Sequence, residues 1–68
     1  MDLQKIFIEN QSLVAELMEK INAAIEEAGF NAEVDRNGRT RYLDLDAYEN
    51  QEDVYNSYAD ILRREYEF

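Results

Sequence analysis

The side chains best able to do chemistry in this chain are its carboxylates. The 68 residues include 16 Asp and Glu but no Cys and no His, so a thiol nucleophile and the usual general base are both missing. Covalent chemistry would fall to Ser12, Ser57, Thr40 or a lysine, and none of these lies in a catalytic motif. Carboxylate pairs do acid–base work when one of them is desolvated, and here they lie mostly on polar faces. The sequence predicts a protein that is not an enzyme and needs no cofactor.

One acidic segment resembles the opening of a calcium-binding loop. Asp44 and Asp46 alternate with apolar residues, as ligands do at the start of such a loop. The pattern then fails, because Tyr48 holds the fifth position, Glu49 replaces the glycine and Tyr55 replaces the bidentate Glu. We therefore predict a solvated acidic turn without a metal, and a weak surface calcium site is the alternative.

The acids are unevenly distributed along the chain. The formal net charge is −9, of which residues 1–28 carry −4, residues 29–41 carry +1 and residues 42–68 carry −6. Residues 42–62 include no base and six acids, which are Asp44, Asp46, Glu49, Glu52, Asp53 and Asp60. Glu26 and Glu27 end the first predicted helix, where the helix dipole disfavours each anion by about 0.3–1 kcal/mol. Either these acids serve solubility, or a function outweighs the local cost.

Five tyrosines accompany the acids. Tyr42 and Tyr48 fall outside the predicted apolar faces, which favours a role at an interface, because Tyr brings contact area with little loss of entropy. Tyr55, Tyr58 and Tyr66 keep helical spacing, so we predict them at the rim of the core.

Three arginines form the only net-positive stretch of the chain. Arg36, Arg39 and Arg41 cluster at the predicted hairpin tip. They could touch a phosphate or an acidic protein, but in a chain of charge −9 they would hold nucleic acid poorly. We therefore expect them to neutralise neighbouring acids and to solubilise the loop.

The elements that must position these residues begin with a helix over residues 2–28. Apolar residues recur there at steps of three and four. The tract Glu9–Ser12 weakens the middle, so one long helix and two abutting helices both remain open. Asn10 lies on the apolar seam and could set the register of a homodimer, or it could mark a helix break or bond the hairpin backbone. Gly29 is predicted to end the helix in a left-handed cap, with Phe30 packing back on Ile25.

Residues 30–45 are predicted to form a hairpin around Asn37-Gly38, because this dipeptide suits a two-residue turn. The predicted pairs are Arg36 with Arg39, Val34 with Arg41, Ala32 with Leu43 and Phe30 with Leu45. In this register Val34, Leu43 and Leu45 share one apolar face with Phe30. The opposite face carries Glu33, Asp35, Tyr42 and Asp44, among others.

Residues 50–66 are predicted to form a second helix, capped at its start by Asp46 with Glu49 or by Asn50 with Asp53. The predicted fold class is α+β, with residues 1–68 as a single small domain in the order α-β-β-α. Both helices would pack on one face of the antiparallel hairpin. A two-stranded sheet leaves two exposed edges, and so small a core suits a chain that gains stability from a partner.

These features together predict a surface that binds a partner. Its residues are Glu26, Glu27, Glu33, Asp35, Tyr42, Asp44, Asp46, Tyr48, Glu49, Glu52 and Asp53. Carboxylates spaced about 6–7 Å apart on a strand or about 5–6 Å apart on a helix would attract a positive channel. The leading hypothesis is an inhibitor that occupies the basic groove of a nucleic-acid-binding protein or nucleoprotein complex by mimicking nucleic acid.

In size, acidity and lack of catalytic residues the whole chain resembles small phage-encoded inhibitors of host defence, including anti-CRISPR and anti-restriction proteins. Such inhibitors share no single fold, so the resemblance carries over no functional residue. It implies a location in the cytoplasm of the host cell. The net charge of −9 argues against direct contact with nucleic acid, and no apolar run is long enough to predict a membrane span. The alternative is a homo-oligomeric interaction module or structural adaptor, such as a homodimer, whose acids keep the assembly soluble.

Overall fold

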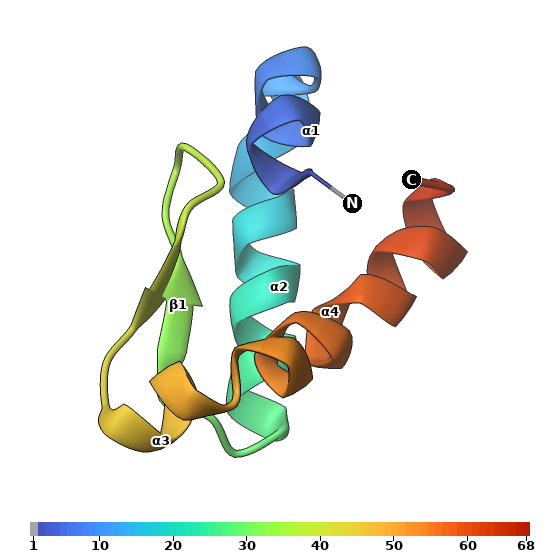
Figure 1. Ribbon diagram of the computed structural model, residues 1–68. Helices are drawn as coiled ribbons and strands as arrows, with labels where there is room; N and C mark the ends of the chain where they lie inside the picture. Colours follow the sequence, from blue (N-terminus) through green and yellow to red (C-terminus); the bar gives the residue numbers. More distant parts are fainter. Residues whose placement is uncertain (1) are drawn as a thin grey trace.

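The structure consists of helices arranged around one β-hairpin. This computed structural model describes residues 2–68. Its elements are α1 (Leu3–Glu9), the 3₁₀ turn η1 (Gln11–Leu13), α2 (Val14–Glu27), β1 (Ala32–Val34), β2 (Thr40–Tyr42), α3 (Leu45–Glu49) and α4 (Gln51–Tyr66). The predicted α+β class with helix–strand–strand–helix order is confirmed. Figure 1 shows α2 in the middle, with the hairpin on one side and α4 leading away on the other.

The first predicted helix is two helices separated by a break at Asn10. This residue has φ −129° and ψ 50°, which is not helical, so the hydrogen-bond ladder of α1 ends there. The Asn10 side chain donates to the Ile6 carbonyl (2.8 Å), and the Gln11 side chain donates to the Phe7 carbonyl (3.0 Å). Because these amides satisfy the last carbonyls of α1, the polar tract ends the helix. Of the alternatives left open, two abutting helices are correct, and Asn10 marks the helix break.

The end of α2 has the predicted cap. Gly29 has φ +86°, the left-handed conformation that glycine adopts without steric cost. Its N–H donates to the Glu26 carbonyl (3.0 Å), and the N–H of Phe30 donates to the Ile25 carbonyl (3.2 Å). This pair of bonds defines a Schellman motif, and Phe30 packs half-buried against the core.

The hairpin register differs by one residue from the predicted one. β1 and β2 are antiparallel. The observed pairs are Ala32 with Tyr42, Glu33 with Arg41 and Val34 with Thr40. The prediction that placed Val34 opposite Arg41 is therefore wrong.

The hairpin loop explains the shift in register. The strands are joined through the three residues Arg36–Gly38 rather than through two, since the N–H of Asp35 donates to the Arg39 carbonyl (2.9 Å). The Asp35 carboxylate accepts hydrogen bonds from the N–H groups of Asn37 (2.8 Å) and Arg39 (3.0 Å). Gly38 takes the left-handed position of this loop, with φ +80°. The side chain of Asp35 thus stabilises the longer loop by bonding the backbone ahead of it.

A shift of one residue exchanges the two faces of a strand. Thr40 and Tyr42, predicted to point away from the core, share the face of buried Val34 and are themselves half-buried. Leu43 and Leu45, predicted to pack on the apolar face, are 47% and 70% exposed. The predicted assignment of these four residues to faces is therefore wrong.

The core lies between α2, β1 and α4. The largest fully buried side chains are Phe7, Leu17, Ile21, Ile25, Val34, Val54 and Leu62. Asn22 of α2 covers the outer edge of β1, because its amide donates to the Val34 carbonyl (3.3 Å) and accepts from the Val34 N–H (2.7 Å). This edge is therefore partly closed by a side chain rather than by a third strand. Within residues 2–68, no helix has both the length and the apolar character needed to cross a membrane.

The second predicted helix is preceded by a short additional one. Residues predicted to end the hairpin form α3, because the Asp44 carboxylate accepts the N–H of Ala47 (2.8 Å) and caps this helix. Neither predicted cap is formed, since Asn50 instead donates its side-chain amide to the Asp46 carbonyl (2.8 Å). The boundaries of α4 itself, Gln51–Tyr66, lie within one residue of the prediction.

Polar contacts attach the end of α4 to α2. The Tyr66 hydroxyl donates to the Glu16 carboxylate (2.6 Å), and Lys20 donates to Glu65 (3.0 Å). The Glu16 acceptor raises the pKa of Tyr66, and the Glu65 carboxylate raises the pKa of Lys20. These exposed contacts orient α4 and add little stability.

Candidate functional site

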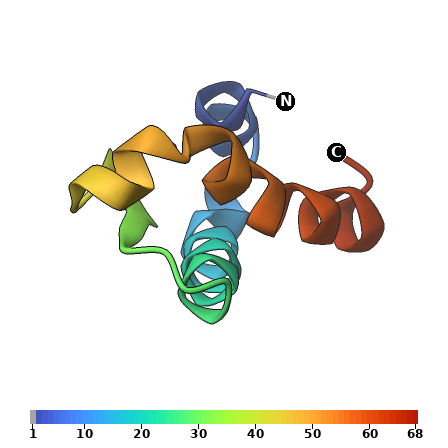
Figure 2. The same cartoon turned by 60° about the horizontal axis from the view of Figure 1, so that its bottom comes forward.

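Three helix ends meet at one end of the molecule. The end of α2, all of α3 and the start of α4 lie together at the bottom of Figure 1, and Figure 2 brings the same group forward. These segments carry seven exposed acids, which are Glu26, Glu27, Asp44, Asp46, Glu49, Glu52 and Asp53. We call this group the acidic end. It joins residues that are up to 27 positions apart in the sequence, from Glu26 to Asp53.

The charge of the acidic end is not neutralised by neighbouring bases. The ion pairs among residues 2–68 are Lys5–Glu9, Lys20–Glu65 and Arg41–Glu33, and none of them includes an acid of the acidic end. No Lys or Arg occurs among the residues of α3 or in the first turns of α4. A formal charge of −7 therefore faces solvent here, out of −9 for the whole chain.

Part of this concentration has a reason in folding. Asp44 caps α3, Asp46 lies in its first turn, and Glu52 and Asp53 lie in the first turn of α4. The helix dipole stabilises anions at these positions by about 0.3–1 kcal/mol each. Four of the seven acids would thus be favoured even without a partner.

Glu26 and Glu27 have no such reason. They form the last turn of α2, which contains no basic residue. An anion there faces the negative end of the helix dipole, at a cost of about 0.3–1 kcal/mol. The stability of α2 therefore does not account for these two acids, and solubility and a binding role both remain open for them.

An apolar patch adjoins the acids. Leu45 is 70% exposed, Tyr48 60% and Leu43 47%, and these three make up most of the large exposed apolar side chains of the described chain. Leu45 and Tyr48 are three residues apart on α3 and so share one face of that helix. We call these three residues the apolar centre. An exposed apolar patch rimmed by polar residues is typical of a protein–protein contact.

Tyr48 is held in place by a second tyrosine. The rings of Tyr42 and Tyr48 meet edge to face, with centroids 6.1 Å apart and planes at 84°. Tyr42, predicted as an interface residue, packs half-buried against the core and supports Tyr48 from beneath. Tyr48 therefore offers an oriented ring, which loses less entropy on binding than a mobile side chain. Tyr55 and Tyr66 pack partly buried against the core, which confirms their predicted rim positions, whereas Tyr58, also predicted at the rim, lies inside the core.

Two predicted site residues lie outside the acidic end. Glu33 pairs with Arg41 across the hairpin (3.3 Å), and Asp35 bonds the loop backbone. Both lie on the hairpin, whose tip is at the far end of the molecule from α3 (Figure 1). Eight of the predicted positions, the seven acids and Tyr48, thus lie on segments at one end of the molecule. Glu33 and Asp35 lie apart on the hairpin, and Tyr42 packs against Tyr48.

Leu43 and Leu45 were missed as site residues, because the wrong register assigned them to the core. The exposure of Leu43 follows from the three-residue loop, and the pair Asp35 and Gly38 is the sequence signal that favours such a loop. Leu45 is exposed because it begins α3 instead of continuing the strand.

Among residues 2–68, no three acids are grouped so that they could hold a metal ion. One carboxylate oxygen of Asp44 already accepts the N–H of Ala47. Comparison with protein-family models, with curated proteins and with solved structures finds no significant match to this chain. The site must therefore be interpreted from its own geometry, which is that of an α+β domain with one strongly acidic end.

Proposed function

We propose that this protein is an inhibitor that occupies the basic groove of a nucleic-acid-binding protein or nucleoprotein complex. The observation that carries the proposal is the acidic end, where the segments that carry seven exposed acids and no base lie at one end of the molecule. A surface of one sign speeds association with a surface of the opposite sign. By occupying the groove, the acidic end would keep nucleic acid out.

The helices that carry the acids suit the proposed binding to a basic groove. Asp46 and Glu49 lie three residues apart on α3, at about 5–6 Å, and Asp44 is fixed by its cap (2.8 Å). Charges on capped helices are presented at set spacings, so little entropy is lost when they meet fixed cations. A flexible acidic tail would lack this advantage.

The apolar centre gives the proposed contact a second component. Leu45 and Tyr48 project beside the carboxylates and would enter a pocket on the partner, since buried aromatic and aliphatic anchors carry much of the affinity of an interface. Electrostatic attraction falls with salt, but apolar burial does not. Binding should therefore weaken steeply with salt and then level off.

The test uses affinity capture with the intact protein at low salt, elution with rising salt, and identification of the proteins released. The triple variant Asp44→Asn, Asp46→Asn, Asp53→Asn removes three charges from the acidic end, and Asn keeps the capping ability of position 44. The matched control is Glu19→Gln, Asp60→Asn, Glu67→Gln, which removes three exposed charges elsewhere.

We expect the captured proteins to bind nucleic acid, to elute at moderate salt, to be lost with the triple variant and to be retained by the control. Capture that ignores salt and survives the triple variant would refute the proposal. An inhibitor of this kind acts in the cytoplasm of the host cell and needs neither a membrane nor direct contact with nucleic acid.

A second candidate function is a homo-oligomeric adaptor, favoured by the exposure of Leu45 and Tyr48. In that case two apolar centres would meet, and the acids would only keep the assembly soluble. This alternative predicts association at micromolar concentration that grows with salt, since salt screens the repulsion between like charges. A monomer at all salt concentrations in analytical ultracentrifugation would exclude it.

A further inference from the structure

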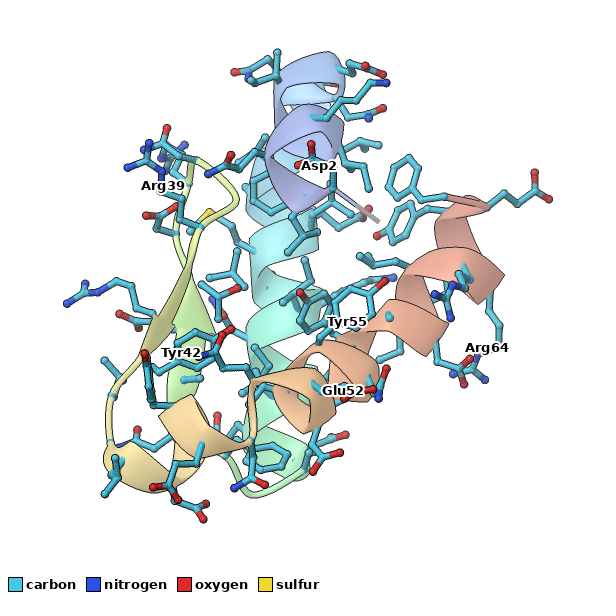
Figure 3. All side chains as sticks on the ribbon, in the orientation of Figure 1. Asp2, Arg39, Tyr42, Glu52, Tyr55 and Arg64 are labelled. Atoms are coloured by element: carbon cyan, nitrogen blue, oxygen red, sulfur yellow. The ribbon has the colours of Figure 1, made fainter. Side chains whose placement is uncertain are left out.

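A cavity lies at the other end of the molecule, between α1 and the hairpin tip. Its volume is about 250 Å³. The lining residues are Gln4, Phe7, Ile8 and Gln11 on one side and Arg36, Asn37 and Arg39 on the other. Figure 3 shows Arg39 at the hairpin tip, level with α1 and far from Glu52 of the acidic end.

The α1 side of the cavity carries two apolar side chains, Phe7 and Ile8, beside the amides of Gln4 and Gln11. Phe7 is buried, but Ile8 is 70% exposed, as much as any large apolar residue of the described chain. An Ile side chain left in water is less favourable than a buried one, because its apolar surface stays hydrated. A ligand with an apolar group would recover part of this free energy by covering Ile8.

The other wall is cationic. Arg36 and Arg39 take part in none of the ion pairs found among residues 2–68, and no acid lines the cavity. The nearest carboxylate along the chain, that of Asp35, accepts two backbone N–H groups of the loop through one oxygen. Two guanidinium groups beside side-chain amides form a donor set that matches a carboxylate or phosphate.

The two walls are held at a set distance by Gly38. A Cβ atom at this position would lie 2.8 Å from the Leu3 carbonyl oxygen and 3.0 Å from the Cα of Gln4. The loop backbone therefore rests directly on the start of α1. Because the Asp35 hydrogen bonds also fix the loop, the arginines are attached to a preformed support.

We infer that this cavity binds a small organic anion, in which a carboxylate or phosphate is joined to an apolar group. The anionic group would lie between Arg36 and Arg39, and the apolar group would lie on Ile8. The volume is below the 300–1,000 Å³ typical of drug-sized ligands, so the ligand is about the size of phenyl phosphate. Figure 3 places Arg39 at the hairpin tip and Glu52 of the acidic end far from it, towards the other end of the molecule. This site and the acidic end are independent.

The experiment is a titration of the ¹⁵N-labelled protein with phenyl phosphate, inorganic phosphate and phenol, monitored by NMR. We expect phenyl phosphate to shift the amide signals around Ile8 and Arg39 and to bind at least about tenfold more tightly than the other two, a difference of about 1.4 kcal/mol. Arg36→Gln with Arg39→Gln should weaken phenyl phosphate at least tenfold. Ile8→Ser should weaken phenyl phosphate and leave inorganic phosphate unchanged.

The matched control is Arg63→Gln with Arg64→Gln, which removes the same charge from α4 and should leave the titration unchanged. Retained amide spectra of each variant establish that it is folded. Equal binding of phenyl phosphate and inorganic phosphate, equal losses in the control variant, or no saturable shift with any ligand would each overturn the inference. None of these results bears on the acidic end, so the two proposals can fail separately.

Discussion

The two glycines provide the sharpest test of how the hairpin is attached to the rest of the fold. Gly29 and Gly38 both have positive φ, +86° and +80°, so alanine at either position is strained by about 1–2 kcal/mol. They differ in surroundings. A Cβ atom at Gly29 meets nothing within 4 Å, whereas one at Gly38 lies 2.8 Å from the backbone oxygen of Leu3.

The Gly29→Ala variant is therefore expected to lose about 1–2 kcal/mol of unfolding free energy, from backbone strain alone. Gly38→Ala adds the cost of pushing the loop away from α1, about 1–3 kcal/mol for overpacking, for a total of about 2–5 kcal/mol. In a domain of this size each 1 kcal/mol lowers the melting temperature by roughly 4–8 °C. Gly38→Ala should melt at least about 4 °C below Gly29→Ala.

The measurement is thermal and urea unfolding of both variants and the parent chain, monitored by circular dichroism at one protein concentration. Gly29→Ala is the control, because it carries the same backbone strain without the contact. Equal losses in the two variants would refute the packing of the hairpin tip on α1, and with it the preformed cavity beside Ile8. A larger loss in Gly29→Ala would refute the assignment of strain altogether.

Three further predictions concern single side chains. Asn22→Ala leaves the N–H and carbonyl of Val34 without their partners, so urea unfolding should show a loss of about 1–3 kcal/mol. Asp44→Ala should cost about 0.5–2 kcal/mol by removing the cap of α3, and Asp44→Asn should cost much less. Burial raises the pKa of Tyr58 from 10.0 to about 12. The folded state therefore holds the Tyr58 hydroxyl proton more tightly than the unfolded state does. The free energy of unfolding below pH 10 should fall by up to about 2–3 kcal/mol as the pH rises to 12. The Tyr58→Phe variant should lose less stability over this pH range.

Each of these has a result that would contradict it. An Asn22→Ala variant as stable as the parent would mean that water replaces the side chain at the edge of β1. Equal melting of Asp44→Ala and Asp44→Asn would argue against the cap, and it would also remove the basis for using Asn at this position in the binding test. If Tyr58→Phe lost as much stability at high pH as the parent, the alkaline loss would have to come from other groups.

The main helices and the acids of the candidate site could be predicted from patterns among neighbouring residues in the sequence. The apolar spacing of residues 14–27 and 51–66 predicts α2 and α4, and Gly29 predicts the Schellman cap, because helix periodicity and a left-handed cap depend on neighbours within a few residues. The absence of bases from residues 42–62 located most of the acidic end for the same reason. Glu26 and Glu27 were identified by a local conflict with the helix dipole.

The register of the hairpin and the position of α2, α3 and α4 relative to one another could not be predicted without the tertiary structure. Both a two-residue and a three-residue turn suit the loop sequence, and the choice depends on the Asp35 hydrogen bonds and on the contact of Gly38 with Leu3. That choice exchanged the faces of β2 and moved Leu43 from the expected core to the surface, and the formation of α3 exposed Leu45 on the same helix as Tyr48.

The sequence by itself determined that the chain is acidic, has no thiol or imidazole chemistry, and forms helix, hairpin and helix. Only the tertiary structure decided that the acid-bearing segments of α2, α3 and α4 lie at one end of the molecule, while Arg36 and Arg39 line a cavity at the opposite end. The physical reason is that composition and periodicity report on neighbours along the chain. The position of a charge relative to distant charges depends on how buried apolar faces pack, and here α2 packs against both β1 and α4.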